Sequence, residues 1–318
     1  MAVHEHPPVT TAHPTTTRHA GIRGAINRRP MLWFFAGAMV LSWIAWLPYI
    51  LSATGLGVLD FRFPALLGTT QFLGVLPGAY LGPILSAFLV TAATEGREGL
   101  KRWVGRLTKW RVSWRWYVGI IVGVPAALIL AALPLSGGDI RFPSAAVLVA
   151  YLPMLVIQIL TTGLSEEPGW RDFALPRLQD RFGPLVGTLI LGPLWGVWHL
   201  PLFFSEWGGY PHISVLAIAE FVLAATTISV VITWVFNRTG ESMPMALLLH
   251  VGINNFASVA ASDMFPTINF EHSDASRISL IASGVVAVIL LIATRGRLGY
   301  QPKPAASTPD QQFGNVRP

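Results

Sequence analysis

The chain has 318 residues, of which 53% are hydrophobic and 12% are charged, and its formal net charge is +6 at pH 7. A soluble globular protein carries roughly twice that charged fraction, so the composition excludes an ordinary water-soluble domain. The chain has no cysteine, which excludes a disulfide framework, a thiolate nucleophile and a zinc–thiolate site. The positive charge lies between apolar runs and not on a separate basic helix, which favours membrane topology over nucleic-acid binding.

Apolar runs with the length that crosses a bilayer recur along the chain. They predict an all-α, polytopic integral membrane helix bundle with about eight transmembrane helices, at residues 31–51, 72–94, 115–135, 144–164, 183–204, 213–236, 243–262 and 277–294. Residues 31–297 form the expected membrane domain. The polar segments 1–30 and 298–318 are expected to be disordered cytosolic tails, and we favour this over a metal-binding role for the four histidines of the first tail.

Lys and Arg are distributed unevenly between the expected spans. If the N-terminus is cytosolic, only Arg62, Arg141 and Arg277 of the 22 Lys and Arg residues lie on the outer side. Because cytoplasmic loops carry an excess of Lys and Arg, we expect both termini in the cytosol and a multi-pass protein of the plasma (inner) membrane. The basic segment 95–116 has apolar residues at steps of three and four, which predicts an amphipathic helix on the inner leaflet. A substrate- or nucleic-acid-binding patch is the alternative for this segment.

Ionisable residues within the spans are few, and three of them stand close together as Glu166, Glu167 and Arg171. Residues four apart on a helix face one another, so Glu167 and Arg171 are expected to pair. Glu166 points about 100° away from that pair and stays available as a base. Pro168 disfavours helical geometry in the residue before it, so we expect the fourth span to break there. Taken alone, the motif fits a capped helix end with a surface ion pair at least as well as a catalytic site.

Two histidines far along the chain also lie within apolar runs. His199 follows Trp195 by four residues in the fifth span, and taken alone it is typical of a packing residue. His250 and Asn254 share one face of the seventh span. Both can donate a hydrogen bond to a single oxygen atom, which is the arrangement that stabilises an oxyanion. An interhelical hydrogen-bond clamp is the alternative for this pair.

Together these motifs resemble the CPBP family of intramembrane proteases, which includes the type II CAAX prenyl endopeptidases and bacterial abortive-infection relatives. The resemblance rests on Glu166-Glu167-x-x-x-Arg171, an aromatic-x-x-x-His199 and His250-x-x-x-Asn254, with a further likeness at residues 237–242. It covers roughly residues 144–262, which would be the motif core of the membrane domain. The sequence departs from the family pattern at Trp195, where phenylalanine is usual.

The resemblance implies an intramembrane endopeptidase that acts on a membrane-tethered or lipidated peptide or protein at the inner leaflet, in contact with the lipid bilayer. Glu166 would be the general base that activates a water, and His199 would help to hold that water. Glu167 and Arg171 would order the site, and His250 with Asn254 would bind the oxyanion. A carboxylate in surroundings of low dielectric constant is a suitable base near neutral pH, which makes this assignment physically coherent.

Several alternatives remain open at this point. Glu166, His199 and His250 are also a catalytic zinc ligand set, so a zinc metalloprotease competes with the expected metal-independent, cofactor-free enzyme. A transporter would show repeated halves with paired broken helices, and the sequence has none. A non-catalytic membrane immunity or scaffold protein would need no hydrolysis. Glu220, in the sixth span, is expected to pair with a histidine or to face a wet cavity. On the expected span limits Glu166 lies near the cytosolic face and His199 near the far end of its span, so a shared site requires a different depth for one of them.

Overall fold

The structure is a computed structural model that describes residues 21–268 and 274–302. Within these ranges the chain is helical and contains no strand, and eight helices are long and apolar enough to cross a membrane. The predicted all-α fold with eight spans is therefore confirmed, and it is that of a multi-pass membrane protein. Most of the two expected tails lies outside the described residues, as do residues 269–273.

Four of the eight spans are composite helices: three contain π-helical turns between α-helical pieces, and one ends in a 3₁₀ turn. The eight spans are Pro30–Leu51, Leu76–Thr94, Trp114–Leu135, Ala145–Phe182, Pro184–Phe204, Val215–Arg238, Met243–Met264 and Asp274–Thr294. Their α-helices are α2 (Pro30–Leu51), α4 (Leu76–Ala79), α5 (Leu85–Thr94), α7 (Trp114–Leu135), α8 (Ala145–Gln158), α9 (Leu164–Glu167), α10 (Leu175–Phe182), α11 (Pro184–Trp198), α12 (Val215–Arg238), α13 (Met243–Asn255), α14 (Ala261–Met264) and α15 (Asp274–Thr294).

The turns within the spans are the π-helical η1 (Tyr80–Ile84), η2 (Ile159–Gly163), η3 (Pro168–Ala174) and η6 (Phe256–Ala260) and the 3₁₀ turn η4 (Leu200–Phe204). Outside the spans lie α1 (Ile22–Arg28), α3 (Gln71–Gly74), α6 (Gly96–Leu107) and the 3₁₀ turn η5 (Glu206–Gly208). α1 falls in the segment 1–30 that we expected to be a disordered tail, so this part of the expectation is wrong.

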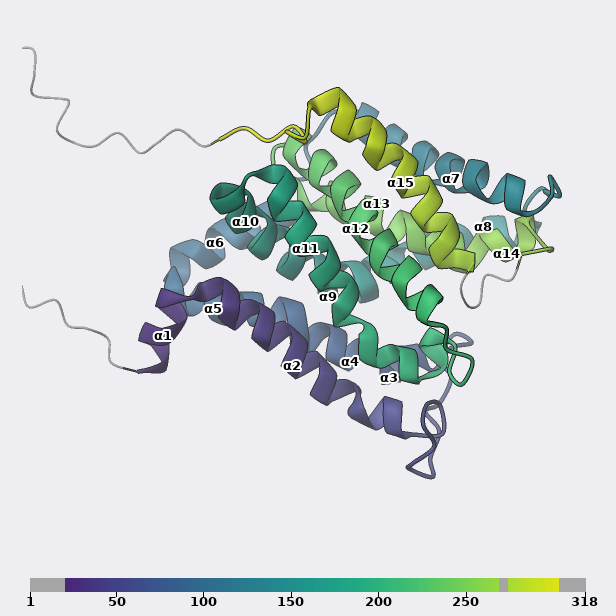
Figure 1. The fold of residues 1–318 in the computed structure, drawn as a ribbon, viewed down its shortest axis with the longest axis horizontal. Helices are drawn as coiled ribbons and strands as arrows, with labels where there is room; N and C mark the ends of the chain where they lie inside the picture. The colour runs from purple at the N-terminus through teal and green to yellow at the C-terminus, as the bar shows by residue number, and fades with distance from the viewer. Residues whose placement is uncertain (1–20, 269–273, 303–318) are drawn as a thin grey trace, which may run out of the picture.

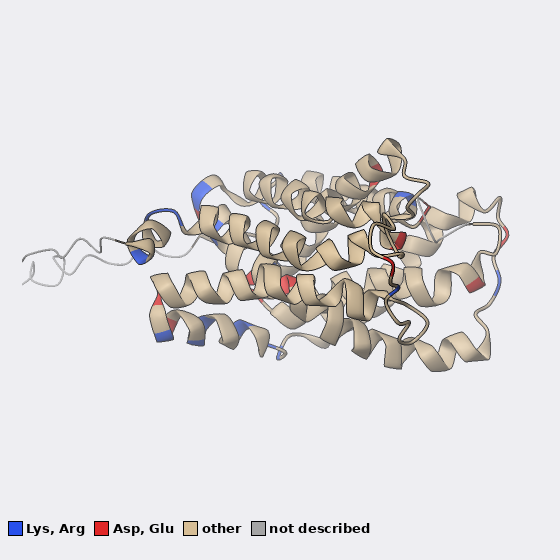
Figure 2. Cartoon of the chain, turned by 90° about the horizontal axis from the view of Figure 1, so that it is seen from below, with Lys and Arg blue, Asp and Glu red and all other residues tan. Residues whose placement is uncertain are grey.

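The bundle has two ends that differ in structure and charge (Figure 1). One end holds α1, α6 and α10, and we call it the basic end because Lys and Arg gather there (Figure 2). The other end holds the segment 52–75, α14 and the start of α12, and we call it the loop end. The hydroxyl of Tyr300 donates to Asp180 of α10 at 2.6 Å, so the last described residues also lie at the basic end.

The predicted amphipathic helix is shorter than segment 95–116 and covers Gly96–Leu107. Its Trp103 is buried, and the indole nitrogen donates to the carbonyl oxygen of Pro168 at 3.0 Å. α6 therefore packs against η3, so one of its faces is covered by protein.

Glu95, just before α6, ties this helix to the fourth span. Its carboxylate accepts hydrogen bonds from Arg102, at 2.8 Å, and from Arg177 of α10. Burial of the carboxyl raises its pKa, but the hydrogen bonds and charges of the two arginines outweigh burial, so the pKa of Glu95 lies below its usual value.

The fourth span does not break at Pro168, contrary to our prediction. Glu167 keeps right-handed helical dihedral angles, with φ −59° and ψ −37°, and the chain continues through η3 into α10. Pro168 is the first residue of η3, and a π turn departs from the regular α-helical hydrogen-bond ladder in any case, so the missing N–H of proline is tolerated there. The result is one span of 38 residues, Ala145–Phe182.

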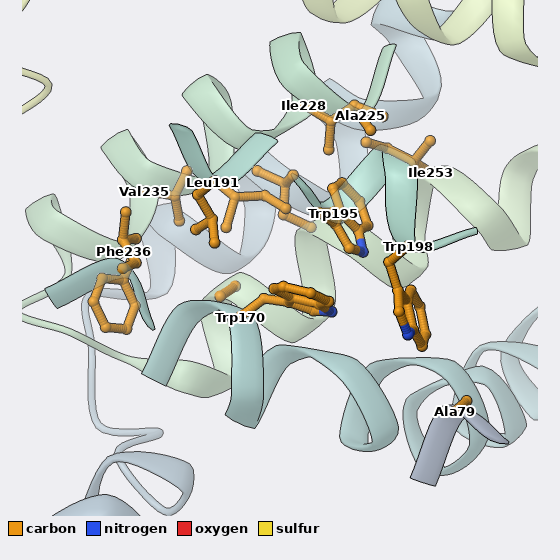
Figure 3. Packing of buried hydrophobic residues seen from close by; sticks show 14 of the residues in the cluster. Ala79, Trp170, Leu191, Trp195, Trp198, Ala225, Ile228, Val235, Phe236 and Ile253 are labelled. Carbon is orange, nitrogen blue, oxygen red and sulfur yellow. The ribbon is translucent and has the colours of Figure 1, made fainter. Parts of the chain in front are cut away.

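The core combines aromatic rings with aliphatic side chains, and Figure 3 shows Trp170 and Trp198 among them. The rings of Trp170 and Trp198 lie 5.8 Å apart between centroids, and Trp198 donates to the hydroxyl of Ser42 at 2.8 Å. Gly169 lets the fourth span touch the second, because a Cβ there would lie 2.6 Å from the Cβ of Pro83. Small residues at such contacts are the usual means by which membrane helices approach closely.

Candidate active site

The predicted pair on the fourth span is present and completely enclosed. A guanidinium nitrogen of Arg171 lies 3.2 Å from an oxygen of Glu167, four residues earlier, and neither side chain is more than 1% exposed. Arg171 also donates to the hydroxyl of Ser229 at 3.1 Å and lies over the ring of Trp195, 4.1 Å from its centroid. These contacts compensate a charge that would otherwise be costly at this depth.

Glu166 points away from this pair, as the helical spacing predicted. The indole nitrogen of Trp195 donates to Oε2 of Glu166 at 2.7 Å. This hydrogen bond leaves Oε1 for other partners. The side chain is 5% exposed and lines a cavity, whereas Glu167 and Arg171 do not. The two adjacent carboxylates therefore have different surroundings, and only the first is open to a ligand.

His250 connects the two carboxylate environments. Its Nδ1 lies 2.8 Å from Oε1 of Glu167, within ion-pair distance although the N–H is not directed at the oxygen as in a hydrogen bond. On its other side, Nε2 lies 3.3 Å from the side-chain nitrogen of Asn254. The imidazole is thus held at one nitrogen by a buried carboxylate, and its second nitrogen is next to an amide at the cavity wall.

His199 is positioned by the end of α11. This helix ends at Trp198, and Nδ1 of His199 is 2.9 Å from the carbonyl oxygen of Trp195. The imidazole stacks on Trp207 with 5.5 Å between ring centroids and an interplanar angle of 11°. Since Nδ1 and one ring face are occupied, Nε2 is the nitrogen that remains for a ligand.

One cavity of about 570 Å³ is lined by Glu166, His199, His250 and Asn254. These residues come from the fourth, fifth and seventh spans, so the structure brings together the groups that the sequence placed far apart. The expected mismatch in depth is resolved because the fourth span continues past Pro168. Glu166 therefore lies inside the bundle and not at a helix end near the cytosolic face.

Two features near the site were missed in the sequence, and one expectation about a more distant glutamate was wrong. Trp195 was noted only as an aromatic replacement, yet its indole nitrogen hydrogen-bonds Glu166. Asp172 is completely buried and pairs with Arg106 of α6, which also pairs with Glu241 at 3.3 Å. No signal in the sequence marked it, because Asp172 follows the fourth apolar run, 144–164, among other charged residues. Glu220 pairs with Arg277 at 2.9 Å, and not with a histidine.

The described residues do not form a ready metal site. Among residues 21–268 and 274–302, no three His, Asp or Glu side chains gather closely enough to hold an ion. Glu166, His199 and His250 share the cavity without meeting as a ligand set, and one nitrogen of His250 faces Glu167 while the other contacts the amide of Asn254. The geometry in hand does not fit zinc, and no step below uses a metal.

Comparison with known proteins agrees with the motifs. A model of the "Type II CAAX prenyl endopeptidase Rce1-like" family matches residues 148–256, a range that contains all six candidate site residues. The curated protein "CAAX prenyl protease 2" of Methanococcus maripaludis is 24% identical over 231 residues, which is 70% of this chain and 81% of that protein. The resemblance inferred from the motifs is therefore confirmed: the part of the chain that carries the candidate site residues is similar to the type II CAAX prenyl endopeptidases.

Proposed function

We propose that the protein is an intramembrane endopeptidase in which Glu166 activates a water molecule. The observation that carries this proposal is the single cavity lined by Glu166, His199, His250 and Asn254, behind which Glu167 and Arg171 are sealed from solvent. A base, a water-holding imidazole and two oxyanion donors are the groups that peptide hydrolysis needs in one place. The matched family and the name of the archaeal relative support the same reaction class.

In the proposed reaction, water held between Glu166 and His199 attacks the carbonyl carbon of the scissile peptide. Glu166 takes one proton from the water as the new C–O bond forms, and the carbonyl oxygen becomes an oxyanion. The C–N bond then breaks, and Glu166 returns the proton to the departing amine. The hydrogen bond from Trp195 to Oε2 fixes the carboxylate so that Oε1 faces the water.

His250 and Asn254 are proposed to stabilise the oxyanion. Their nitrogens are 3.3 Å apart, which allows both to contact one oxygen atom. Glu167 lies beside Nδ1 of His250, which leaves Nε2, when it carries a proton, as the nitrogen that donates to the oxyanion. Glu167 and Arg171 are thus positioning residues that act through His250 and Trp195.

We propose a substrate that is tethered to the membrane, as a peptide or as a lipidated protein, in the plasma (inner) membrane. The cavity lies within the eight-span bundle, so a segment must be held at the bilayer to reach Glu166. We also propose that hydrolysis needs no metal. Activity of the purified protein in chelator, together with its metal content, tests this: cleavage that requires stoichiometric zinc contradicts a metal-independent reaction.

The decisive variant is Glu166→Gln, compared with the matched control Glu220→Gln. Glu220 is also a glutamate within a span, but it pairs with Arg277 and does not line the cavity. Membrane peptides from cells that express each form are compared by mass spectrometry. We expect cleavage products with the unchanged protein and with Glu220→Gln, and none with Glu166→Gln. Undiminished cleavage by Glu166→Gln would contradict Glu166 as the base, and an absence of cleavage products even with the unchanged protein would favour a non-catalytic membrane component.

A further inference from the structure

The mouth of the catalytic cavity is at the loop end of the bundle. Its lining includes Thr69, Gln71 and Phe72 from the segment between the first two spans, and Ser276 and Ser279 from the first turns of α15. α2 leads from α1 at the basic end to this segment, and Figure 1 shows α3 far from α1, α6 and α10. The cavity therefore extends from Glu166 towards the loop end.

The cavity is closed towards the basic end. No residue of α1, α6 or α10 lines it. On that side Trp170 and Arg171 are at most 1% exposed, and the Trp170 ring packs on Phe34 with 5.5 Å between centroids. Trp103 of α6 covers η3 from the same direction through its hydrogen bond to Pro168. A peptide that approached from the basic end would meet this packed layer.

The charge distribution assigns the two ends to the two sides of the membrane. Among the described residues, Arg62, Arg141 and Arg277 are the only Lys or Arg residues of the loop-end segments, and the others, apart from Arg171 inside the bundle, belong to segments at the basic end. Figure 2 shows this asymmetry for the described residues. An excess of Lys and Arg marks the cytoplasmic side of a membrane protein, so the loop end is the extracytoplasmic side.

From these two observations we propose that the substrate enters the site from the extracytoplasmic face. This rests on the proposed peptidase function and changes the expected substrate from a cytosolic protein end at the inner leaflet to a segment of an exported protein that is anchored in the outer leaflet. Among the residues that the structure describes, the cavity lining contains no Lys, Arg or Asp, and Glu166 is the one carboxylate in it. Apolar lining residues such as Met154 and Phe221 lie beside Gln71 and Gln158, which suits an uncharged, partly apolar peptide.

Single-cysteine labelling tests the direction of the mouth. The natural chain has no cysteine, so Gln71→Cys at the mouth and Lys101→Cys on α6 each introduce one thiol, and both positions are exposed. A membrane-impermeant maleimide is added to right-side-out spheroplasts and to inverted membrane vesicles. We expect Gln71→Cys to be labelled only in spheroplasts and Lys101→Cys only in inverted vesicles.

Labelling after denaturation shows that each variant is present in the membrane. Labelling of Lys101→Cys in spheroplasts, or failure to label Gln71→Cys there, overturns the proposal. This readout needs no catalysis. If the labelling is as expected and Glu166→Gln is still fully active, the proposed function fails while the orientation of the mouth stands.

A blocking experiment connects the mouth to turnover. A maleimide carrying a long poly(ethylene glycol) chain is attached to purified Gln71→Cys or Lys101→Cys protein, and cleavage of membrane peptides is compared before and after attachment to the same variant. We expect loss of cleavage on attachment at Gln71→Cys and no loss at Lys101→Cys. Loss at Lys101→Cys, or unchanged cleavage after attachment at Gln71→Cys, overturns entry at the loop end.

Discussion

Replacement of Glu167 by glutamine tests whether the sealed ion pair holds the site together. Glutamine keeps the size of the side chain but removes its charge, which leaves Arg171 charged and at most 1% exposed. The contacts that remain to Arg171 are the hydroxyl of Ser229 and the ring of Trp195, which carry no charge, while Glu166 offers a weaker charge interaction than Glu167 does. Because breaking a buried ion pair by removing one partner costs about 3–5 kcal/mol, we expect a large loss of stability.

The magnitude follows from the size of the chain. Each kcal/mol changes the melting temperature by roughly 2–4 °C in a domain of this order of size, so Glu167→Gln is expected to melt roughly 6–12 °C lower even at the bottom of that range of cost. Unfolding in detergent is followed by tryptophan fluorescence, since Trp170, Trp195 and Trp198 are buried around the pair. The double variant Glu167→Gln/Arg171→Met removes both charges and is expected to recover part of the loss.

A double-mutant cycle gives the deciding result. If the two residues stabilise the protein as a pair, the single losses are not additive, with a coupling energy of about 1–3 kcal/mol. Additive losses, or a Glu167→Gln protein as stable as the unchanged one, would refute the role of the pair. Glu220→Gln is the control, because its partner Arg277 is 37% exposed and can be hydrated.

The remaining predictions concern the base, the helix contact and pH. Trp195→Phe removes the hydrogen-bond donor to Glu166. We expect kcat/KM to fall by about tenfold or less, because water in the cavity can replace one hydrogen bond. A much larger decrease would mean that the indole has a further role. Gly169→Ala places a Cβ 2.6 Å from Pro83; it should lower the melting temperature and the activity together, and a protein of unchanged stability would contradict the close contact. The lowered pKa of Glu95 stabilises the fold above the pKa that this carboxyl has in the unfolded chain, and this stabilisation is lost as the pH falls through the pKa in the folded protein. Glu95→Gln should therefore lower the melting temperature more at neutral pH than in acid. An equal decrease at both pH values would refute the ion pairs of Glu95 as the source of this stability.

The fold class and much of the site chemistry could be predicted from the sequence because each depends on local pattern. An apolar run of bilayer length predicts a membrane span whatever its tertiary contacts are, and two residues four apart share one face of a helix. On this basis the eight spans, the pair of Glu167 with Arg171 and the neighbouring His250 and Asn254 were all predicted. Burial of Asp172 could not be seen in this way, since its partner Arg106 is distant in the sequence.

Continuity of the fourth span at Pro168 also required the tertiary structure. A proline alone predicts a break, but the chain stays helical into α10, where Gly169 packs on Pro83 and Trp103 covers η3. This changes the depth of Glu166 and so decides whether one site can exist at all. A local rule cannot supply that answer, because the compensating contacts come from other spans.

The sequence by itself determined an eight-span membrane helix bundle, the order and spacing of the candidate site residues, and the uneven placement of Lys and Arg, all of which are properties of composition and spacing. Only the tertiary structure decided that Glu166 opens into a cavity while Glu167 is sealed behind it, and that the mouth of this cavity is opposite the basic end. Enclosure is a property of surfaces from several spans packed together, and one-dimensional periodicity carries no information about which surfaces meet.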